Sequence, residues 1–426
     1  GAYTTGALSF AGDAALQDSL PRLLRTGTLE PVQVASTTAL PAWSLPALAH
    51  DAAGVRRRLF AEGLAAVQSA LAGGDLRWEE WQAVARRWAQ LALIRYQAAG
   101  SLETETRQIY AEVQGRLDTA FAGWLHDQYA SLAGRRLPTP HHLFHVPGYL
   151  ASLRQERPRV ALLVLDGMSL AVWQQIRAVW VRRHPDWQMD EQLLLAQIPS
   201  ITAISRQSLI SGQRPALFAD SLTHNGREET LWKRFWEGVG LSAGAAEYAF
   251  LPDRADTFDP PSVGSRRTQA LCLVSPVIDE IVHGATQGIG SVYASVELWL
   301  HNRDDQRQGS AWLEGLIERL RENDYAVALT SDHGHVEAVG IGQPQEGVTV
   351  RSRSRRARLY ESEQFARSVQ SDYPETVLWH NDGLLPDSVW VLLAAGRRAF
   401  APPGEVVVSH GGLSLEEMVV PLVMIS

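Results

Sequence analysis

The sequence predicts an α/β protein in which helices cover both faces of a mainly parallel β-sheet, with an all-helical domain in front of it. Two observations support this prediction. Between positions 51 and 132, apolar residues recur mostly every three or four residues, which is the period of an amphipathic helix. After Pro158, short unbroken apolar runs alternate with helical patterns, as is typical of buried parallel strands joined by helices. We therefore divide the chain into residues 1–50, 51–150 and 151–426.

The composition excludes several classes of protein. The chain has 426 residues, 45% hydrophobic and 20% charged, which suits a soluble protein of two or three domains. A net charge of −8 argues against a surface that binds nucleic acid everywhere, although a local basic patch remains possible. The single cysteine, Cys272, excludes a disulfide framework and a cysteine-cluster metal site. Any metal must therefore be held by His, Asp and Glu.

No part of the sequence predicts a membrane association. No apolar run reaches the roughly 18 residues that a membrane span needs, and no charged-then-apolar leader is visible. We therefore expect a cytoplasmic location and no membrane partner. The chain begins at Gly1 instead of a methionine, which suggests that it is part of a longer protein.

Residues 1–50 form the first segment, where prolines at positions 31, 41 and 46 indicate short helices and loops. Breaks at 73–74 and 100–101 divide the next segment into three expected helices, at about 51–72, 78–99 and 103–132. Their tryptophans are expected to pack in the core of a bundle. The proline-rich segment 134–149 carries His141, His142 and His145. We expect these histidines in an exposed loop, not at a metal, because no carboxylate lies nearby in sequence.

Six apolar runs predict the strands of the mainly parallel sheet. They lie at 160–165, 193–198, 326–330, 389–393, 406–408 and 418–425. Pro421 in the last run predicts an edge or bulged strand, because proline cannot donate a ladder hydrogen bond. Helical patterns between the strands include residues 203–211, 292–300 and 312–321.

Polar side chains cluster where these strands end. Ligands in open α/β sheets bind just beyond the carboxyl ends of the strands. The residues at or near such ends are Asp166, Ser200, Thr202, Arg206, Asp279, His283, Asp332, His333, His335 and His410. One aspartate after a strand often only caps the following helix. Several polar segments directed at one edge of a sheet are hard to explain as capping, and they indicate a site.

The order of these motifs resembles the alkaline phosphatase superfamily. It consists of an Asp, a Pro-x-x-Thr turn, an Asp-x-x-x-His pair, an Asp-His-Gly turn and a late His. Within that superfamily, the segments PSITAISRQSLISGQRP, LWKRFWEG, LTSDHGH and SHGGLSLEEMVVPLV resemble the PglZ domain of BREX phage-defence systems and of some bacterial response regulators. The resemblance covers about residues 155–426 and implies an alkaline-phosphatase-like fold there.

The resemblance also implies a site with two divalent metal ions. One ion would be bound by Asp166, Thr202, Asp332 and His333, and the other by Asp279, His283 and His410. Mixed nitrogen and oxygen ligands favour zinc, with manganese possible. Two ions about 3.5–4 Å apart can clamp the attacking and leaving oxygens of a phosphoryl group. Asp279 and His283 are four residues apart, so on a helix they would project from one face.

Thr202 is the expected nucleophile, because a bound divalent cation favours the alkoxide form of its hydroxyl. The alternative is that Thr202 only caps the helix that follows it; Ser200 and Ser205 are other candidate nucleophiles. Arg206, four residues further on, is expected to contact a phosphate oxygen, although it could instead pair with a surface carboxylate. His335 is expected beside the metal ligands and not among them.

The sequence contains three further charged features near these motifs, namely Glu416, Glu417 and the arginine-rich run 351–358. Glu416 and Glu417 are expected to cap the last strand and not to bind metal. The run 351–358 carries five arginines and could overhang the site, where it would suit a nucleic-acid strand. A solvated loop is the simpler interpretation of that run.

The motifs, together with this resemblance, imply a metal-dependent phosphoesterase, expected to be a phosphodiesterase or nuclease before a monoesterase, in bacterial phage defence. Thr202 would attack in line and water would hydrolyse the phosphothreonine. The expected partners are a phosphodiester of a nucleic acid or nucleotide, as substrate, and other defence-system proteins. A sulfatase is disfavoured because Cys272 lacks the required Pro and Arg context, and a phosphoglycerate mutase would use serine at position 202. The alternative is a scaffold that binds metal for stability and docks partner proteins through its helical part.

Overall fold

The computed structural model describes residues 14–25, 52–98, 102–135, 137–251, 261–302, 309–345, 350–379 and 382–426, together with residues 28, 29 and 32. Most of the first predicted segment, 1–50, lies outside these residues, apart from a helix α1 (Ala14–Arg25). Everything below refers to the described residues.

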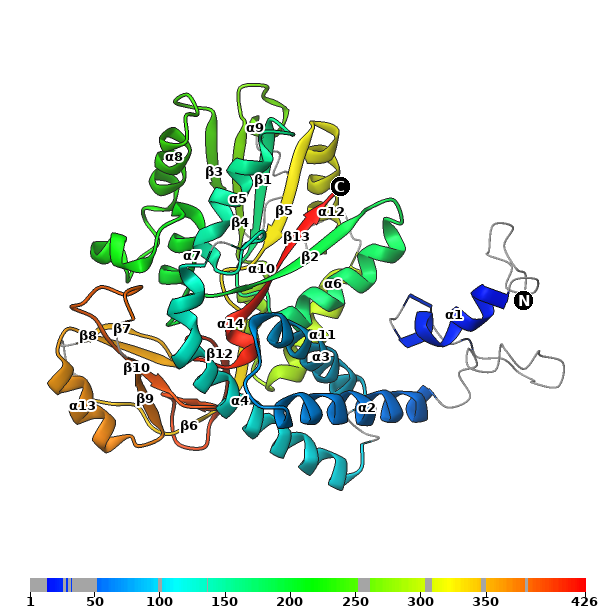
Figure 1. The fold of residues 1–426 in the computed structure, drawn as a ribbon, viewed down its shortest axis with the longest axis vertical. Coiled ribbons are helices and arrows are strands. Elements are labelled where there is room, and N and C mark those ends of the chain that lie inside the picture. Colours follow the sequence, from blue (N-terminus) through cyan, green and yellow to red (C-terminus); the bar gives the residue numbers. More distant parts are fainter. Residues whose placement is uncertain are drawn as a thin grey trace.

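The three predicted helices of the helical region are confirmed. They are α2 (Ala52–Ala72), α3 (Trp78–Gln97) and α4 (Thr104–Ala133). Trp78, Trp81 and Trp88 lie in the core, as expected, whereas Trp124 is only partly buried. The Trp88 ring stacks on Tyr110 with centroids 4.7 Å apart, and Trp81 meets Phe121 edge-on at 5.0 Å. Figure 1 shows these helices below the main sheet. Buried side chains continue without a break from the helices into the sheet.

The main sheet has six strands in the order β2-β13-β5-β1-β4-β3. These are β1 (Arg159–Leu165), β2 (Met189–Leu195), β3 (Ala246–Phe250), β4 (Ala270–Ser275), β5 (Tyr325–Thr330) and β13 (Val419–Ile425). β1 pairs in parallel with β4 and β5, β3 pairs in parallel with β4, and β13 runs antiparallel to β2 and β5. The predicted fold class, a mainly parallel sheet preceded by helices, is therefore confirmed.

Helices cover both faces of this sheet (Figure 1). They are α5 (Val146–Leu153), α6 (Leu170–Arg183), α7 (Thr202–Ser211), α8 (Glu228–Gly238), α9 (Pro261–Gly264), α10 (Val277–Gly284), α11 (Ile289–His301) and α12 (Ala311–Glu322), with the short helices η4 (Leu143–His145), η5 (Pro215–Ser221) and α14 (Leu415–Met418). α6 and α11 also contact α3, so the helical region packs onto one helical layer of the α/β part.

Two smaller sheets lie beside the main one. β7 (Val350–Arg353), β8 (Ala357–Tyr360), β10 (Trp390–Ala394) and β9 (Thr376–Trp379) form an antiparallel sheet that packs on α13 (Glu363–Asp372). β6 (Val336–Gly340) pairs with β11 (Arg398–Ala399) and β12 (Val406–Ser409). The sequence analysis assigned the runs at 389–393 and 406–408 to the main sheet, which is wrong for both, because an apolar run does not name the strand it pairs with.

The prediction of an edge strand at Pro421 is also wrong. β13 lies between β2 and β5. Pro421 pairs with Leu193 of β2, whereas the ladder with β5 begins only at Leu422. Pro421 therefore lies outside the ladder between β13 and β5. At such a position a proline, which has no N–H to donate, is tolerated in an interior strand. The second predicted strand, 193–198, was placed too late in the sequence, because β2 begins at Met189. The prediction missed the first part of β2 because most of its residues are polar and not fully buried.

The expectation that the histidines of the segment 134–149 are exposed is wrong. His141 and His142 are buried and His145 is partly buried, packed between the end of α4 and the start of η4. The His141 Nε2 atom lies 2.7 Å from the carbonyl oxygen of Leu132, and the His142 ring meets Tyr129 edge-on at 4.6 Å. The segment is therefore part of the core and not a loop between domains.

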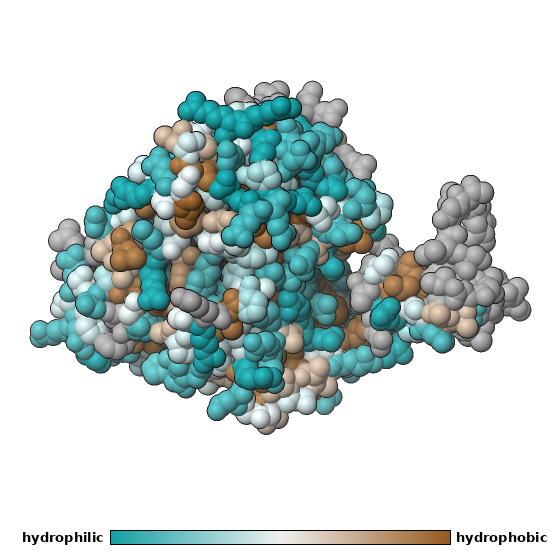
Figure 2. Space-filling view, turned by 45° about the horizontal axis from the view of Figure 1, so that its top comes forward, coloured by the Kyte–Doolittle hydropathy of each residue, from teal (hydrophilic) through white to brown (hydrophobic). Residues whose placement is uncertain are grey.

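No described helix is long and apolar enough to cross a membrane. Figure 2 shows hydrophilic side chains over most of the face that it displays, with apolar residues in small groups between them.

Candidate metal centre

Three neighbouring parallel strands bring the predicted site residues to one edge of the sheet. β5, β1 and β4 are adjacent, so their carboxyl ends lie side by side. Asp166 directly follows β1, Asp332 follows β5 by two residues, and Asp279 lies in the first turn of α10, which follows β4. Gly167 has a φ of +73°, and a Cβ there would lie 3.2 Å from Asp279 Oδ1, so a glycine allows this close approach.

Asp166, Asp332 and His333 form a buried group whose ligand atoms all lie within 4.8 Å of one another. His333 Nε2 is 3.6 Å from Asp166 Oδ1 and 3.8 Å from Asp332 Oδ2. Burial, and then the neighbouring Asp166 carboxylate, raise the pKa of Asp332 well above its usual value. Two carboxylates this close repel each other, and a cation beside them offsets the repulsion; Arg206 supplies one such charge.

Asp279, His283 and His410 form a second group, which also meets the 4.8 Å criterion and opens toward solvent. His283 Nε2 lies 3.2 Å from Asp279 Oδ2, and the His283 side chain is 64% exposed. The two residues project from one face of α10, as predicted. The His410 ring stacks on His333 with centroids 3.7 Å apart, so the two groups adjoin.

Hydrogen bonding and burial shift the pKa values of this second group in different directions. The hydrogen bond with Asp279 raises the pKa of His283. Burial alone would raise the pKa of Asp279, but His283 and the two other nearby histidines lower it overall. Burial, and then the neighbouring His333, lower the pKa of His410 to about 4, so this imidazole is neutral at pH 7 and able to bind a metal.

Thr202 lies where the two groups meet. It is the first residue of α7, and the N-cap of that helix is Ile201, so Thr202 does not take the capping position. Its Oγ1 instead lies 2.9 Å from His333 Nε2. Thr202 is partly exposed, whereas Ser200 and Ser205 are fully buried and engaged in hydrogen bonds with the backbone.

Arg206 is buried among carboxylates. Its Nε donates to Glu228 Oε1 at 2.8 Å and its Nη1 donates to Asp166 Oδ2. Asp332 Oδ2 lies 3.7 Å from the same Nη1. Glu228 also accepts from the hydroxyl of Tyr248. Contact between Arg206 and a phosphate stays a prediction, and it would require the guanidinium to give up one of these partners.

A set of buried hydrogen bonds holds the loop that carries His410. Ser200 Oγ donates to the Gly412 carbonyl at 3.0 Å, and the Gly411 N–H donates to Ser200 Oγ at 3.1 Å. The Ser200 carbonyl lies 2.9 Å from His410 Nδ1. This contact leaves the His410 Nε2 atom free for a metal, as is usual for ligating histidines.

Glu417 and Arg356 hold the same loop from its other side. Arg356 Nη2 donates to Glu417 Oε2 at 2.7 Å, and the Gly412 N–H donates to Glu417 Oε1 at 2.9 Å. Burial alone would raise the pKa of Glu417, but Arg356 lowers it to about 2. Arg356 belongs to the arginine run 351–358 and is fully buried. Arg358 is buried as well, so these two members are structural, and the interpretation of the whole run as a solvated loop is wrong.

The residues present fit a divalent cation at each group. Among the residues that the structure describes, Asp166 Oδ1, Asp332 Oδ2 and Asp279 Oδ1 are buried atoms without a hydrogen-bond partner. Buried carboxylate oxygens without partners are costly, and a cation would satisfy them. Carboxylate oxygens with imidazole nitrogens suit zinc or manganese. The structure thus brings together all seven predicted metal-binding positions, and their roles as ligands stay predictions.

Three residues lie beside the site without belonging to either metal group, and the sequence analysis identified His335 and Glu417 but not Glu228. His335 Nδ1 lies 2.9 Å from the Gly167 carbonyl, and His335 belongs to neither group, which agrees with its expected place beside the ligands. Glu417 belongs to the capping box of α14 and not to a metal group. Glu228 was missed, because nothing in its own sequence context distinguishes it from a surface residue of a helix.

Comparison with known families gives one match that covers most of the chain. Residues 150–425 match the family model described as the BREX system PglZ alkaline phosphatase-like domain. This match includes every residue of the two groups. No curated protein matches the chain.

Several solved structures resemble the chain. They include murine ectonucleotide pyrophosphatase/phosphodiesterase 5 (13% identity, TM-score 0.43, covering 62% of this chain and 88% of that one). The human protein of the same name has 11% identity and a TM-score of 0.42, covering 63% of this chain and 87% of its own. Phosphonoacetate hydrolase from Sinorhizobium meliloti 1021, in complex with phosphonoformate, has 13% identity and a TM-score of 0.40, covering 63% of this chain and 90% of its own.

Proposed function

The chain belongs to the PglZ family of BREX-system alkaline phosphatase-like domains, and from this premise we propose that it hydrolyses phosphoric esters with Thr202 as the nucleophile. One observation carries the proposal. The Thr202 hydroxyl, 2.9 Å from His333 Nε2, lies at the junction of two groups of candidate metal ligands. The hydroxyl thus faces the candidate ligands, and Thr202 does not occupy the N-cap position of α7.

In the proposed reaction, the two groups of ligands and Thr202 have separate roles. Asp166, Asp332 and His333 would hold one divalent ion and Asp279, His283 and His410 the other; when bound, these ions would favour the alkoxide form of Thr202 and offset the charge of the phosphoryl group. Thr202 Oγ1 gives up its proton to water and forms a bond to phosphorus, while the bond from phosphorus to the leaving alcohol oxygen breaks and that oxygen takes up a proton from water. Water then cleaves the phosphothreonine, which releases the phosphoryl product and restores the hydroxyl.

We propose a phosphodiester as the substrate, and a nucleic acid or nucleotide in the context of phage defence. Arg355 supports an anionic substrate at the mouth of the site. Its side chain is 57% exposed, lies 3.9 Å from the Glu405 carboxylate, and is near enough to His283 for its charge to oppose protonation of that imidazole, whose pKa the hydrogen bond with Asp279 still raises overall. A second ester group of a diester would extend out of the site past these residues. The proposed ions are zinc or manganese.

The test is hydrolysis of bis-p-nitrophenyl phosphate and p-nitrophenyl phosphate by chelator-treated protein with zinc or manganese added back. Metal removal should abolish activity, and the diester should be preferred. Thr202→Ala and Asp332→Ala should each lower kcat by roughly a thousand-fold or more. Ser208→Ala is the matched control on α7, because the Ser208 hydroxyl is buried and has no hydrogen-bond partner.

Unchanged activity in both Thr202→Ala and Asp332→Ala would disprove this mechanism. Hydrolysis of neither ester by metal-loaded protein would favour the alternative in which the chain acts mainly as a docking subunit.

A further inference from the structure

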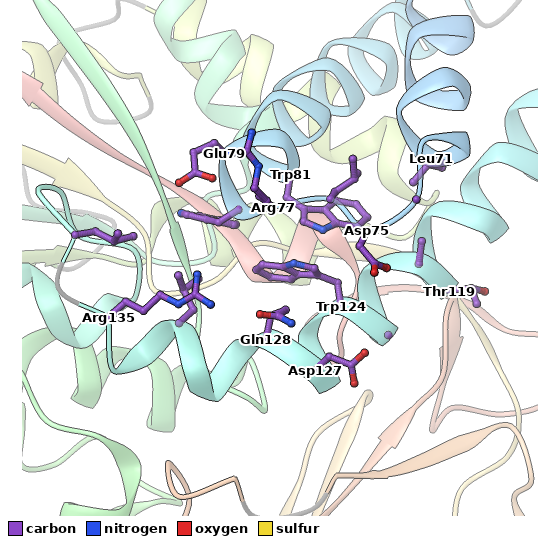
Figure 3. A pocket seen from close by; sticks show the side chains of 17 residues that line it. Leu71, Asp75, Arg77, Glu79, Trp81, Thr119, Trp124, Asp127, Gln128 and Arg135 are labelled. Atoms are coloured by element: carbon purple, nitrogen blue, oxygen red, sulfur yellow. The ribbon is translucent and has the colours of Figure 1, made fainter.

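The helical region contains a cavity that the proposed catalysis does not use. It has a volume of about 680 Å³ and lies between the connection of α2 to α3 and the exposed side of α4. This size is typical of ligand-binding clefts. We call it the α3–α4 groove; its walls come from residues 71–81 and 119–137. Figure 3 shows it from close by.

Tryptophans form the floor of the α3–α4 groove. The ring of Trp124 lies 5.9 Å from that of Trp78 and 6.1 Å from that of Trp81. Trp124 is only partly buried, so part of its ring is open to the groove. Trp81 is buried, and its Nε1 has no hydrogen-bond partner in the described part of the chain. Partly open tryptophans in a cleft are typical anchors for a bound side chain.

The two ends of the groove carry opposite charges. Asp75 lies to one side of Trp124 and Arg135 to the other (Figure 3). Both are exposed, and in the part of the chain that the structure describes neither has an ion-pair partner. By contrast, Arg77 on the rim already pairs with Glu80. The groove thus offers the Asp75 carboxylate and the Arg135 guanidinium on opposite sides of an aromatic floor.

We propose that the α3–α4 groove binds a short peptide segment of a partner protein. An aliphatic or aromatic side chain of that segment would rest on Trp124, a basic residue would face Asp75, and an acidic residue or a carboxyl terminus would face Arg135. Membership in a multi-component defence system agrees with a protein partner. The proposal does not depend on the phosphoesterase activity.

Charge argues against nucleic acid as the occupant. The groove walls contain three acidic residues, Asp75, Glu79 and Asp127, against two arginines. One of those arginines, Arg77, is already paired. A strand with a phosphate at every nucleotide would meet these carboxylates, whereas a peptide can place charges of both signs.

Two glycines on α4 offer a matched pair of variants. Gly123 lines the groove and Gly115 does not. Both are exposed, and a Cβ at either position would meet no atom within 4 Å. Gly123→Leu should fill the groove, whereas Gly115→Leu adds the same side chain to the same helix two turns away. Both changes favour helix formation, so neither is expected to unfold α4.

The probe is a library of random twelve-residue peptides displayed on phage and selected on the wild-type chain. Enriched peptides are synthesised and their Kd is measured by calorimetry. We expect a shared basic, apolar and acidic order. Gly123→Leu should weaken binding at least ten-fold and Gly115→Leu less than two-fold. Asp75→Lys and Arg135→Gln should each weaken it two- to ten-fold. Asp75→Lys changes an exposed residue of a turn, so it remains informative if Gly123→Leu does not fold.

The proposal is overturned if no peptide is enriched, or if the enriched peptides bind Gly123→Leu and Asp75→Lys as well as wild type. It is also overturned if adenosine monophosphate or a twenty-nucleotide single-stranded DNA binds in a manner that Gly123→Leu abolishes, while no peptide does. In all cases Gly123→Leu should hydrolyse both nitrophenyl esters like wild type, which separates this test from that of the proposed function.

Discussion

Individual side chains around the site fall into those that face its centre and those that hold them in place. Thr202 and the aspartates 166, 279 and 332 face the centre, and the sequence revealed them because they follow strands or open a helix. Arg206 and Ser200 instead support the site: Arg206 pairs with Asp166, and Ser200 holds the loop that carries His410 by a hydrogen bond to Gly412. The sequence marked both as candidates for direct roles, but whether a side chain points into a site or supports it depends on partners such as Glu228, which lie far away in sequence.

Arg206 allows a prediction that separates these two roles. Arg206→Ala would leave Asp166 and Glu228 without their cation, and breaking such buried pairs typically costs about 3–5 kcal/mol of unfolding free energy. Urea unfolding measures this loss. Adding Glu228→Gln should restore part of the stability. If Arg206 also contacts the phosphate, the KM of Arg206→Lys for both esters should rise more than its kcat falls; an unchanged KM would assign Arg206 to support alone.

Ser200 allows a second prediction at this scale. Ser200→Ala removes the hydroxyl that holds Gly411 and Gly412, next to His410. Losing a group that orients a metal ligand typically lowers metal affinity ten- to a hundred-fold. We expect a decrease in that range for zinc, measured by competition with a chromogenic chelator. Ser208→Ala should leave the zinc affinity unchanged, and an equal loss in both variants would contradict a specific role for Ser200.

At the scale of elements, the sequence predicts long periodic or fully apolar segments best. The three helices of the helical region and strands β1 and β5 appear within about two residues of the predicted bounds. β2 was misplaced because Asp190, Glu191 and Gln192 break its apolar pattern at the edge of the sheet. β13 was misjudged because the consequence of Pro421 depends on where the neighbouring ladder ends, which only the tertiary pairing determines.

The buried histidine segment between α4 and α5 leads to a prediction about pH. Burial, and then the neighbouring His141, lower the pKa of His145 from 6.5 to about 4. Between pH 6.5 and 4 the unfolded chain therefore binds more protons at this position than the folded chain. The free energy of unfolding should thus fall as the pH decreases through this window.

His145→Phe keeps a ring against Phe144 and cannot be protonated. The variant should lose part of this pH dependence. The loss should be somewhat less than about 1.4 kcal/mol per pH unit, because His145 is partly exposed. Urea unfolding at pH 7 and pH 5 measures the difference. His126→Phe is the control, because His126 is exposed, and an equal change in both variants would contradict the assignment.

At the scale of the whole molecule, the helical region and the α/β part are joined by a partly buried chain of polar contacts. Arg397 donates to Asp118 of α4 at 2.8 Å and to Glu416 at 2.7 Å, and Trp88 of α3 donates to the same Glu416 carboxylate at 2.7 Å. The Glu416 carbonyl oxygen is so close to Gly334 that a Cβ there would overlap it. Glu416 therefore contacts both the helical region, through its side chain, and the turn that carries Asp332 and His333, through its backbone.

This connection predicts that disturbing the helical region at Asp118 reduces catalysis without touching the site. Arg397→Ala should lower the free energy of unfolding by about 3 kcal/mol, because it leaves the buried Asp118 carboxylate without its cation; Asp118→Ala should lower it less, because Arg397 keeps Glu416 as a partner. A double-mutant cycle should give a coupling energy above about 1 kcal/mol, whereas the exposed pair of Glu363 and Arg367 should give about 0.5 kcal/mol or less. Both single variants should also lower kcat for the nitrophenyl diester several-fold with little change in KM, because the turn next to His333 loses its support. A coupling energy no larger than that of the exposed pair, together with an unchanged kcat, would mean that the helices pack beside the α/β part without positioning it.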